Sequence, residues 1–207
     1  MKRSLLLAVL TCAALVAHAA DEEGFVSLMD GKTLTGWKPS EHKSTWKVED
    51  GAFVAHGNRS HLFYVGDLQP FLNFELKVDC WTEPGSNGGI YIATKYQDND
   101  WPKHGYEIQV NNTHADPIKT ASIYGVKNVM NVSPAKDGQW WTQHIIVKGK
   151  TITVKIDGKV ANEFTEEPDR KPGKDFTRIL GEGTFALQGH DPKSTVKYKN
   201  IRVKRLD

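Results

Sequence analysis

Apolar and polar residues alternate with a period of two along most of this chain, and the clearest example is the segment 105–112. One side of it is apolar and carries Tyr106, Ile108 and Val110. The other side carries a carboxylate and two amides, from Glu107, Gln109 and Asn111. This period is typical of a strand with one face in the core. The polar face is either a ligand surface or an ordinary face in contact with water.

The same alternation predicts strands through the rest of the chain, and no segment has the period of a long helix. The predicted strands are residues 25–29, 46–49, 52–55, 71–78, 89–93, 141–147, 151–156, 160–164, 185–190 and 196–203. The pairs Asp50-Gly51 and Asp157-Gly158 each predict a tight hairpin. Many short strands joined by turns predict an all-β, two-sheet antiparallel sandwich of the jelly-roll type. We expect residues 170–183, rich in charge and glycine, to form a mobile loop.

The N-terminal residues have the pattern of a secretory signal peptide, which we assign to residues 1–19. A basic tip is followed by an apolar run at 5–16 and a small-residue cleavage site at 17–19. The apolar run is too short to cross a bilayer of about 30 Å as a helix. We therefore expect cleavage near Ala19 or Ala20, a periplasmic or extracellular protein, and no stable membrane insertion.

The remaining chain, residues 20–207, fits a single domain without net charge. The full sequence has 27 basic and 25 acidic residues, and the signal contains two of the basic ones. This balance gives no electrostatic attraction to nucleic acid. Cys80 is the one cysteine after the signal, so an internal disulfide is excluded. Because no local Cys-His signature accompanies it, we interpret Cys80 as a small core side chain rather than a catalytic thiol.

Six motifs in order give the chain a resemblance to a known family. They are FVSLMDGKTLTGW at 25–37, WKVEDG at 46–51, SNGGIY at 86–91, GYEIQ at 105–109, IYGV at 123–126 and NIRVK at 200–204. This set resembles the signature of the 3-keto-disaccharide hydrolase family, across essentially the whole mature chain. The resemblance implies a concanavalin-like jelly roll and an exported bacterial protein that acts on sugars oxidised at C3. The partner it implies is a carbohydrate, and neither it nor the sequence indicates an oligomeric state.

A substrate of this kind needs a base, because the ketone at C3 acidifies the hydrogen on C2. Removal of that proton forms an enolate, the group on C1 leaves by elimination, and water then adds to give net hydrolysis. Glu107 is our candidate carboxylate. His190 is the second catalytic candidate, because it shares one face of the strand 185–190 with Gln188 and titrates near neutrality. The alternative for His190 is an exposed turn residue before Asp191.

A divalent metal is another way to stabilise an enolate, and it is the one cofactor that we consider. Glu107 and His190 with one further ligand would hold such an ion. The sequence contains no ligand-spaced cluster of the His-x-x-x-His kind, so the metal stays an open alternative.

Further polar and aromatic residues are candidates for contact with the substrate. They are Asn87, Tyr91, Trp101, Gln109, Asn111, Gln188 and Arg202. Trp101 either stacks on a sugar ring or folds back over the core. Arg202 is out of phase with its apolar neighbours, so it either reaches the floor of the groove or forms a surface salt bridge. The segment around Asn87 and Tyr91 is either a ligand contact or a plain turn.

Three classes of function follow from these residues. The first is an exported enzyme that cleaves 3-keto-glycosides, with Glu107 and His190 in the acid and base roles. The second is a carbohydrate-binding module without catalysis, which the same fold would support. The third, a retaining glycosidase with two close carboxylates, is disfavoured, because the strand of Glu107 carries amides where a partner acid would stand.

Overall fold

The structure is a computed structural model that describes residues 23–206. The predicted signal peptide lies outside these residues. The described elements are β1 (Val26–Ser27), β2 (Trp37–Pro39), η1 (Lys43–Thr45), β3 (Trp46–Glu49), β4 (Ala52–His56), β5 (Ser60–Tyr64), β6 (Phe74–Thr82), β7 (Gly88–Thr94), β8 (Tyr106–Val110), β9 (Trp141–Lys148), β10 (Thr151–Ile156), β11 (Lys159–Thr165), β12 (Thr184–Gly189) and β13 (Thr195–Arg205). The all-β prediction is therefore confirmed. Within residues 23–206, no helix has the length and apolar character that crossing a membrane requires.

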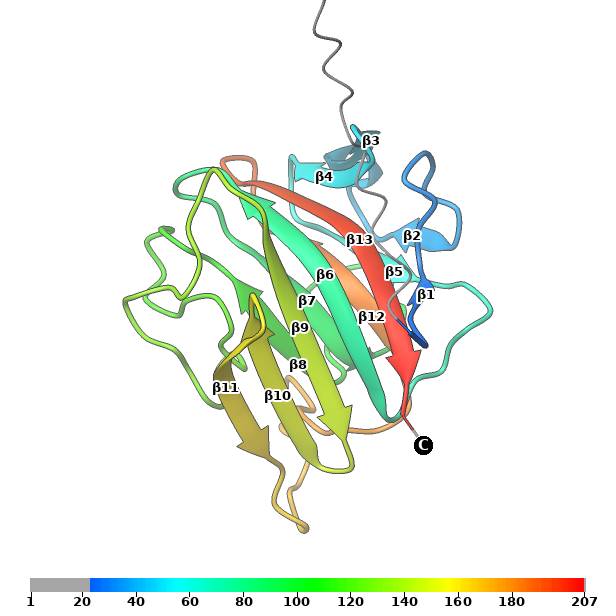
Figure 1. Cartoon of the computed structure of the whole chain (residues 1–207), viewed down its shortest axis with the longest axis vertical. Helices are drawn as coiled ribbons and strands as arrows, with labels where there is room; N and C mark the ends of the chain where they lie inside the picture. Colours follow the sequence, from blue (N-terminus) through cyan, green and yellow to red (C-terminus); the bar gives the residue numbers. More distant parts are fainter. Residues whose placement is uncertain (1–22, 207) are drawn as a thin grey trace, which may run out of the picture.

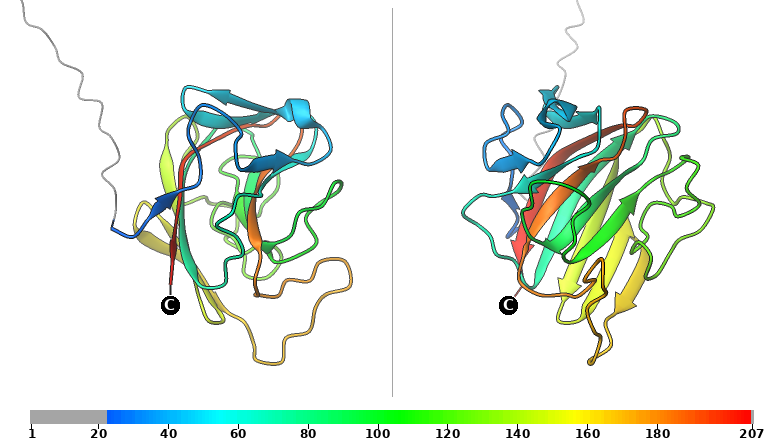
Figure 2. Two further views of the ribbon diagram at one scale, coloured as in Figure 1. Left: turned by 90° about the vertical axis from the view of Figure 1, so that its right-hand side faces the viewer. Right: turned by 180° about the vertical axis from the view of Figure 1, so that it is seen from behind.

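Two antiparallel sheets face each other (Figure 1; Figure 2). The larger sheet has the order β11-β10-β9-β6-β13-β4-β3, with β1 paired to β13. The smaller sheet has the order β2-β5-β12-β7-β8. In both sheets most neighbours are distant in sequence, so the sandwich is the predicted two-sheet jelly roll. The smaller sheet brings β8 and β12 to either side of β7, which is the arrangement that would place Glu107 and His190 on one surface.

Both predicted hairpins are present, and their turns have the backbone that the sequence implied. Asp50 and Gly51, between β3 and β4, have φ angles of 50° and 76°. Asp157 and Gly158, between β10 and β11, have φ angles of 48° and 79°. Two consecutive positive φ angles define the turn whose twist matches that of paired antiparallel strands. These two pairs therefore set the register next to each turn, and in the second hairpin the register shifts between Val154 and Lys155.

The core lies between the sheets and is made by the apolar side of each alternating strand. Tyr106, Ile108 and Val110 of β8 belong to it, as predicted. Tyr198 crosses the core from β13 of the larger sheet. Its hydroxyl donates to the carbonyl of Gln188 at 2.9 Å and lies 3.3 Å from the amide nitrogen of Gly89. This buried tyrosine thus ties β12 and β7 together directly beneath the outer face of the smaller sheet.

Two strands of the smaller sheet, β2 and β5, have no counterpart among the predicted strands. All five residues of β5 are buried, because the segment 95–105 covers its outer face as the core covers its inner face. A strand buried on both faces has no alternation to reveal it. The loop after β11, residues 166–183, contains no strand, in agreement with the loop prediction.

Candidate active site

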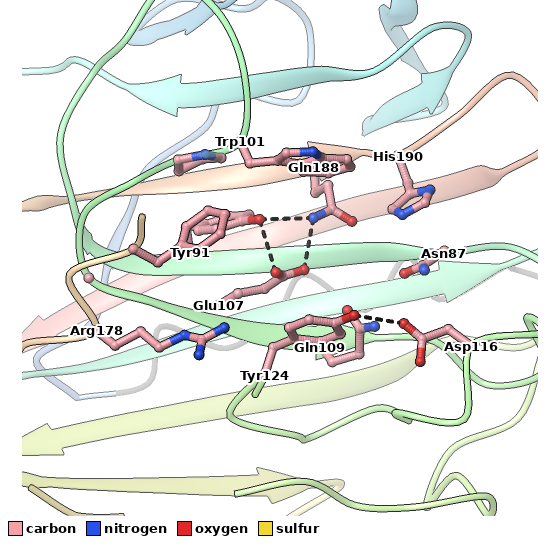
Figure 3. A pocket seen from close by; sticks show the side chains of 13 residues that line it. Asn87, Tyr91, Trp101, Glu107, Gln109, Asp116, Tyr124, Arg178, Gln188 and His190 are labelled. Carbon is pink, nitrogen blue, oxygen red and sulfur yellow. Dashed lines mark hydrogen bonds between the residues drawn. The ribbon is translucent and has the colours of Figure 1, made fainter. Parts of the chain in front are cut away.

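A pocket of about 220 Å³ opens on the outer face of the smaller sheet. Strands β7, β8 and β12 supply its floor, because directly paired residues point to the same side of a sheet. The floor residues are Tyr91, Glu107, Gln109 and Gln188. Loops supply the walls, with Asn87, Trp101, Asp116, Tyr124, Phe176, Arg178 and His190 among them (Figure 3). The pocket thus combines segments that are up to about a hundred residues apart.

Glu107 lies at the centre of this pocket and accepts hydrogen bonds on both carboxylate oxygens. Tyr91 Oη donates to Oε2 at 3.0 Å, and Gln188 Nε2 donates to Oε1 at 2.8 Å. Gln188 Nε2 also donates to Tyr91 Oη at 3.1 Å, which closes a triangle of hydrogen bonds (Figure 3). The amide of Gln109 is assigned the orientation in which its nitrogen donates to the Gly88 carbonyl at 2.8 Å and to Glu107 Oε1 at 3.2 Å. Three neighbours therefore fix the direction of the carboxylate.

The surroundings of Glu107 bring its titration close to neutral pH. Burial raises the pKa of Glu107 to about 7, and nearby Asp116 adds to this effect. The hydrogen bonds from Tyr91 and Gln188, together with the positive charge of Arg178, lower the pKa and partly offset burial. A carboxylate in this state takes up and releases a proton near neutral pH, which suits a general base or acid.

Gly89 has no side chain, and this leaves space for the carboxylate of Glu107. Gly89 is paired with Gln109 on β8, and a Cβ atom at Gly89 would lie 2.7 Å from Glu107 Oε1. Real Cβ atoms do not approach an oxygen so closely, so any larger residue here would displace the carboxylate. The glycine in the SNGGIY motif therefore serves the close approach of an acidic side chain across the backbone of β7.

His190 stands at one end of the pocket, immediately after β12 (Figure 3). Its Nδ1 donates to Asp191 Oδ2 at 2.7 Å, in the tautomer that this contact requires. Burial raises the pKa of Asp191, but hydrogen bonds from His190, the Lys193 amide and Ser194 outweigh burial and lower it. An ionised Asp191 orients the imidazole of His190.

Two further side chains surround His190. The ring of His114 lies 5.7 Å away, and burial lowers the pKa of His114. Asn87 Nδ2 lies 3.5 Å from His114 Nδ1, and Asn87 Oδ1 is buried without a hydrogen-bond partner. This end of the pocket therefore contains an imidazole held by a carboxylate and a free amide oxygen.

Trp101 forms the upper wall of the pocket rather than part of the core. Its ring contacts that of His190 at 5.2 Å and that of buried His61 at 5.5 Å between centroids. Arg59 lies 5.0 Å from the Trp101 ring and pairs with neighbouring Asp100 at 3.2 Å. The amide of Gln97 donates to the Trp101 carbonyl at 2.9 Å. These contacts present an aromatic face to the pocket, where it can cover the apolar face of a sugar.

Six lining residues were not among the candidates from the sequence: Pro102, Gly105, Asp116, Tyr124, Phe176 and Arg178. Tyr124 Oη donates to Asp116 Oδ2 at 3.0 Å, and burial with this bond raises the pKa of Tyr124 to about 12. Arg178 Nη1 donates to the Gly125 carbonyl at 3.2 Å, which holds the cation at the end of the pocket opposite His190 (Figure 3). Tyr124 and Gly125 belong to the IYGV motif, which was the available signal for this wall.

Two predicted substrate contacts, Asn111 and Arg202, do not line the pocket, so these two predictions are wrong. Asn111 follows β8 and is fully buried; its Nδ2 donates to the carbonyls of Asp116 and Ile118 at 3.0 and 2.8 Å. It therefore shapes the loop that carries Asp116. Arg202 belongs to β13 of the larger sheet, so it faces the opposite side of the sandwich, 3.8 Å from Asp79. The surface-pair alternative describes Arg202 better than the groove.

The proposed metal ligands do not come together with a third one in the described part of the chain. Between residues 23 and 206, no group of three or more His, Cys, Asp or Glu side chains has the spacing to hold a metal ion. The oxygens of Glu107 accept from Tyr91 and Gln188 instead. The donor set around Glu107 thus fits hydrogen bonding to its carboxylate.

Comparisons with known proteins agree with this fold. A protein from Parabacteroides distasonis ATCC 8503, described as a candidate glycosyl hydrolase, has a TM-score of 0.74 and 24% identity, with 89% of this chain and 95% of that chain covered. The carbohydrate-binding module CBM66 from Bacillus subtilis has a TM-score of 0.57 and 13% identity, with coverages of 82% and 95%. The lumenal domain of VIP36, bound to Ca²⁺ and Man3GlcNAc, has a TM-score of 0.57 and 11% identity, with 89% of each chain covered.

At these identities the structural similarities establish the fold, and the family comes from the sequence. No curated protein matches the chain significantly. A family model described as a 3-keto-alpha-glucoside-1,2-lyase-like domain matches residues 24–204, which include every residue of the pocket and all of the described strands except Arg205, the last residue of β13. The chain belongs to the family of 3-keto-alpha-glucoside-1,2-lyase-like domains.

Proposed function

We propose that this protein is an exported enzyme that cleaves 3-keto-glycosides by proton abstraction at C2. The observation that carries the proposal is Glu107, a carboxylate on the floor of the pocket, held by Tyr91 and Gln188 and given a pKa of about 7. Family membership supports a sugar ketone as substrate. The signal-peptide pattern of residues 1–19 supports action in the periplasm or outside the cell.

The chemistry proceeds as an elimination. Glu107 takes the proton from C2, and the electron pair of that bond passes into the C3 ketone to form an enolate. The enolate then collapses, C1=C2 forms, and the C1–O bond breaks with its electron pair on the leaving oxygen. A proton supplied to that oxygen releases the leaving group as an alcohol. Water then adds across the C1=C2 bond, so that the sum of both steps is hydrolysis.

The layout of the pocket matches the order of the reacting atoms. Arg178 lies at one end, Glu107 in the middle and His190 at the other end (Figure 3). With C2 above Glu107, a ketone at C3 that points toward Arg178 receives positive charge as the enolate develops. The oxygen on C1 then points toward His190, which delivers the proton to the leaving group. Asp191 holds His190 for this role.

The second candidate function is a carbohydrate-binding module without catalysis. The fold is the observation that supports it. CBM66 and VIP36 share the two-sheet architecture over most of this chain. Fold does not determine function. What favours the enzyme is that a binding site alone gives no reason to bury a carboxylate until its pKa rises by more than two units.

Isotope exchange at C2 separates the two candidates and identifies the chemistry. The purified protein is incubated in D₂O with a 3-keto-glucoside and with its unoxidised parent, with and without a chelator. Aglycone release and deuterium at C2 of the sugar product are followed by NMR. We expect release and C2 deuteration from the keto sugar alone.

The other possible results of the isotope-exchange experiment point to other functions. Release without C2 deuteration would indicate a conventional glycosidase. Binding without release would establish the binding module, and loss of activity with chelator would show a metal requirement. Glu107→Gln and His190→Ala should both remain folded, and turnover should fall by about 10²–10⁴-fold if these groups transfer protons. Unchanged turnover in both variants would contradict the residue assignment.

A further inference from the structure

Two buried oxygen atoms in the pocket lack any hydrogen-bond donor. Among the described residues, few buried polar side-chain atoms have no partner, and Asn87 Oδ1 and Gln188 Oε1 are two of them. Both residues line the pocket, and the exposed fraction of each is only 1–2%. A buried acceptor without a donor is unfavourable, so native proteins usually provide a partner from protein, water or ligand. Here the side open to the pocket is where a partner can enter.

The orientation of both amides follows from their surroundings. Gln188 Nε2 donates to Tyr91 Oη and Glu107 Oε1 at 3.1 and 2.8 Å. A reversed amide would place its oxygen against the carboxylate. The nitrogen of Asn87 faces His114 Nδ1, which already accepts from the Asp116 amide at 3.1 Å. A reversed Asn87 would bring two acceptors together. The free ends of both side chains are therefore the oxygens.

The two oxygens lie on the same side of Glu107. Figure 3 shows the amide oxygen of Gln188 directed away from Tyr91, toward the end of the pocket with Asn87 and His190. The positive end, with Arg178, is on the other side. The pocket thus offers donors at one end and acceptors at the other. Because the acceptors are neutral amides, they accept from a hydroxyl group without adding a negative charge beside Glu107.

We propose that Asn87 Oδ1 and Gln188 Oε1 form an acceptor pair that binds two hydroxyl groups of the sugar substrate at the His190 end of the pocket. The proposal rests on the proposed function and specifies what the substrate must carry there: free hydroxyls, and neither ethers nor deoxygenated carbons. The amide of Gln188 then makes two different interactions. Its nitrogen donates to the catalytic base Glu107, and its oxygen accepts a hydrogen bond from the substrate. A hydroxyl bound to Oε1 polarises the amide and strengthens its hydrogen bond to Glu107.

Binding to a set of sugar analogues tests the pair. Calorimetry measures the affinity of the wild-type protein for an unoxidised glucoside, for its monodeoxy derivatives and for its O-methyl derivatives. These ligands bind without reacting. We expect at least one deoxy derivative to bind the wild type about tenfold or more weakly, because it leaves a buried acceptor unpaired. For the hydroxyl that Asn87 Oδ1 binds, the deoxy derivative and the parent should bind Asn87→Ala with equal affinity.

Matched variants separate recognition from structure. Asn87→Asp keeps the acceptor oxygen, so it should retain the preference for the parent sugar. Gln188→Glu also keeps an acceptor but loses the donor to Glu107, so it should retain the preference while its pH–rate profile moves to higher pH. Melting temperatures establish that each variant is folded.

The outcomes distinguish this proposal from the proposed function. No binding of any glucoside, or deoxy penalties that are the same in the wild type and in Asn87→Ala, would overturn the acceptor pair. Those results would leave C2 deuteration untouched. Conversely, a preference for hydroxyls without release of aglycone from the keto sugar would sustain the acceptor pair and overturn the enzyme.

Discussion

The ionisation of the buried Glu107 lowers the stability of the folded protein at neutral pH. Its pKa rises from 4.5 to about 7 because of burial. Below pH 4.5 the carboxyl is neutral in both folded and unfolded chains. Between pH 4.5 and 7 the unfolded chain ionises first, so the stability due to this group is lost as pH rises through the folded pKa.

Glu107→Gln removes this titration. We expect the free energy of unfolding of the wild type, relative to that of Glu107→Gln, to fall between pH 4.5 and 7 by at most about 3 kcal/mol. The value is an upper bound, because the carboxylate keeps some contact with solvent in the pocket. Urea titrations of both proteins at pH 4, 5.5, 7 and 8 measure it. A difference that is constant across this range would show that the carboxyl titrates normally.

The pH dependence of activity reports the same group in its working state. A base must be ionised, so on the acid side kcat/KM for the 3-keto-glucoside should rise with pH through a midpoint of about 7. Tyr91→Phe removes a hydrogen bond that lowers the pKa of Glu107, and Arg178→Met removes a positive charge with the same effect. Both variants should move the midpoint to higher pH. A midpoint that stays in place in both would contradict Glu107 as the titrating base.

Sequence reasoning at this scale found Glu107, Gln188 and His190 but not Arg178. The first three occupy polar positions of strands or the residue just beyond one, where alternation tells which face a side chain takes. Arg178 lies in the loop 166–183, where no period exists, and its place depends on a contact with Gly125. Asn111 shows the opposite failure, because the alternation that placed it beside Gln109 stops at Val110, where β8 ends.

Among the strands, β7 contains Gly89, whose lack of a side chain allows the Glu107 carboxylate to lie over the backbone. In Gly89→Ala the new methyl group would meet Glu107 Oε1 at 2.7 Å, so the carboxylate must move away from Tyr91 and Gln188. We expect turnover to fall about tenfold or more, with a stability change of about 1 kcal/mol, since a side-chain end moves more easily than a backbone.

Gly181→Ala is the matched control for this change. A Cβ atom at Gly181 meets no heavy atom within 4 Å, and the residue lies in the loop before β12. Turnover and melting temperature of this variant should match those of the wild type. Equal turnover in Gly89→Ala and Gly181→Ala would show that catalysis continues when the Glu107 carboxylate is displaced. That result would contradict the role of the hydrogen-bond triangle in positioning the base.

The loop that carries Arg178 is anchored by one buried carboxylate, Glu166. Its Oε1 accepts from Tyr106 Oη at 2.9 Å and from the Leu180 amide at 2.7 Å, and its Oε2 accepts from Lys150 at 2.9 Å. Glu166→Ala leaves two buried donors unpaired, so we expect a loss of about 2–4 kcal/mol in the free energy of unfolding and a higher KM.

Lys150→Ala provides the comparison for the anchor. The side chain of Lys150 is 53% exposed, so its removal should cost less than about 1 kcal/mol and leave KM unchanged. Urea unfolding and initial rates on both variants measure these effects. If the two substitutions were equally costly, the ion pair with Lys150, and not the bonds to Tyr106 and Leu180, would be what holds the loop.

Over the whole molecule, the sequence predicts the two sheets better than it predicts which strands are neighbours. Strands with one face in the core, such as β6 and β10, are recognised by their alternation, and both Asp-Gly hairpins form as predicted. The pocket requires β8 to lie next to β7 and β12 to lie on its other side, a pairing that joins Leu187 to Ile90, about a hundred positions earlier. No local pattern carries that information, so the sequence left open whether the strands of Glu107 and Gln188 share a sheet.

Cys80 offers a probe of how cooperatively these distant strands come apart. It lies on β6, between β13 and β9 in the middle of the larger sheet, and its thiol is fully buried. Burial raises the pKa of the thiol well above its usual value, so the folded protein holds it in the unreactive form. We expect its modification by a thiol reagent to require separation of the two sheets.

The rate of this modification should therefore follow global unfolding. Across a urea series, the free energy obtained from Cys80 labelling should equal that from tryptophan fluorescence, and Glu166→Ala should lower both by the same amount. Cys80→Ala, labelled under the same conditions, gives the background. Labelling that is much faster than global unfolding would mean that β6 opens locally while the pocket stays intact. In that case the smaller sheet would hold the active site independently of the larger one, which the bond from Tyr198 to the strands beneath the pocket argues against.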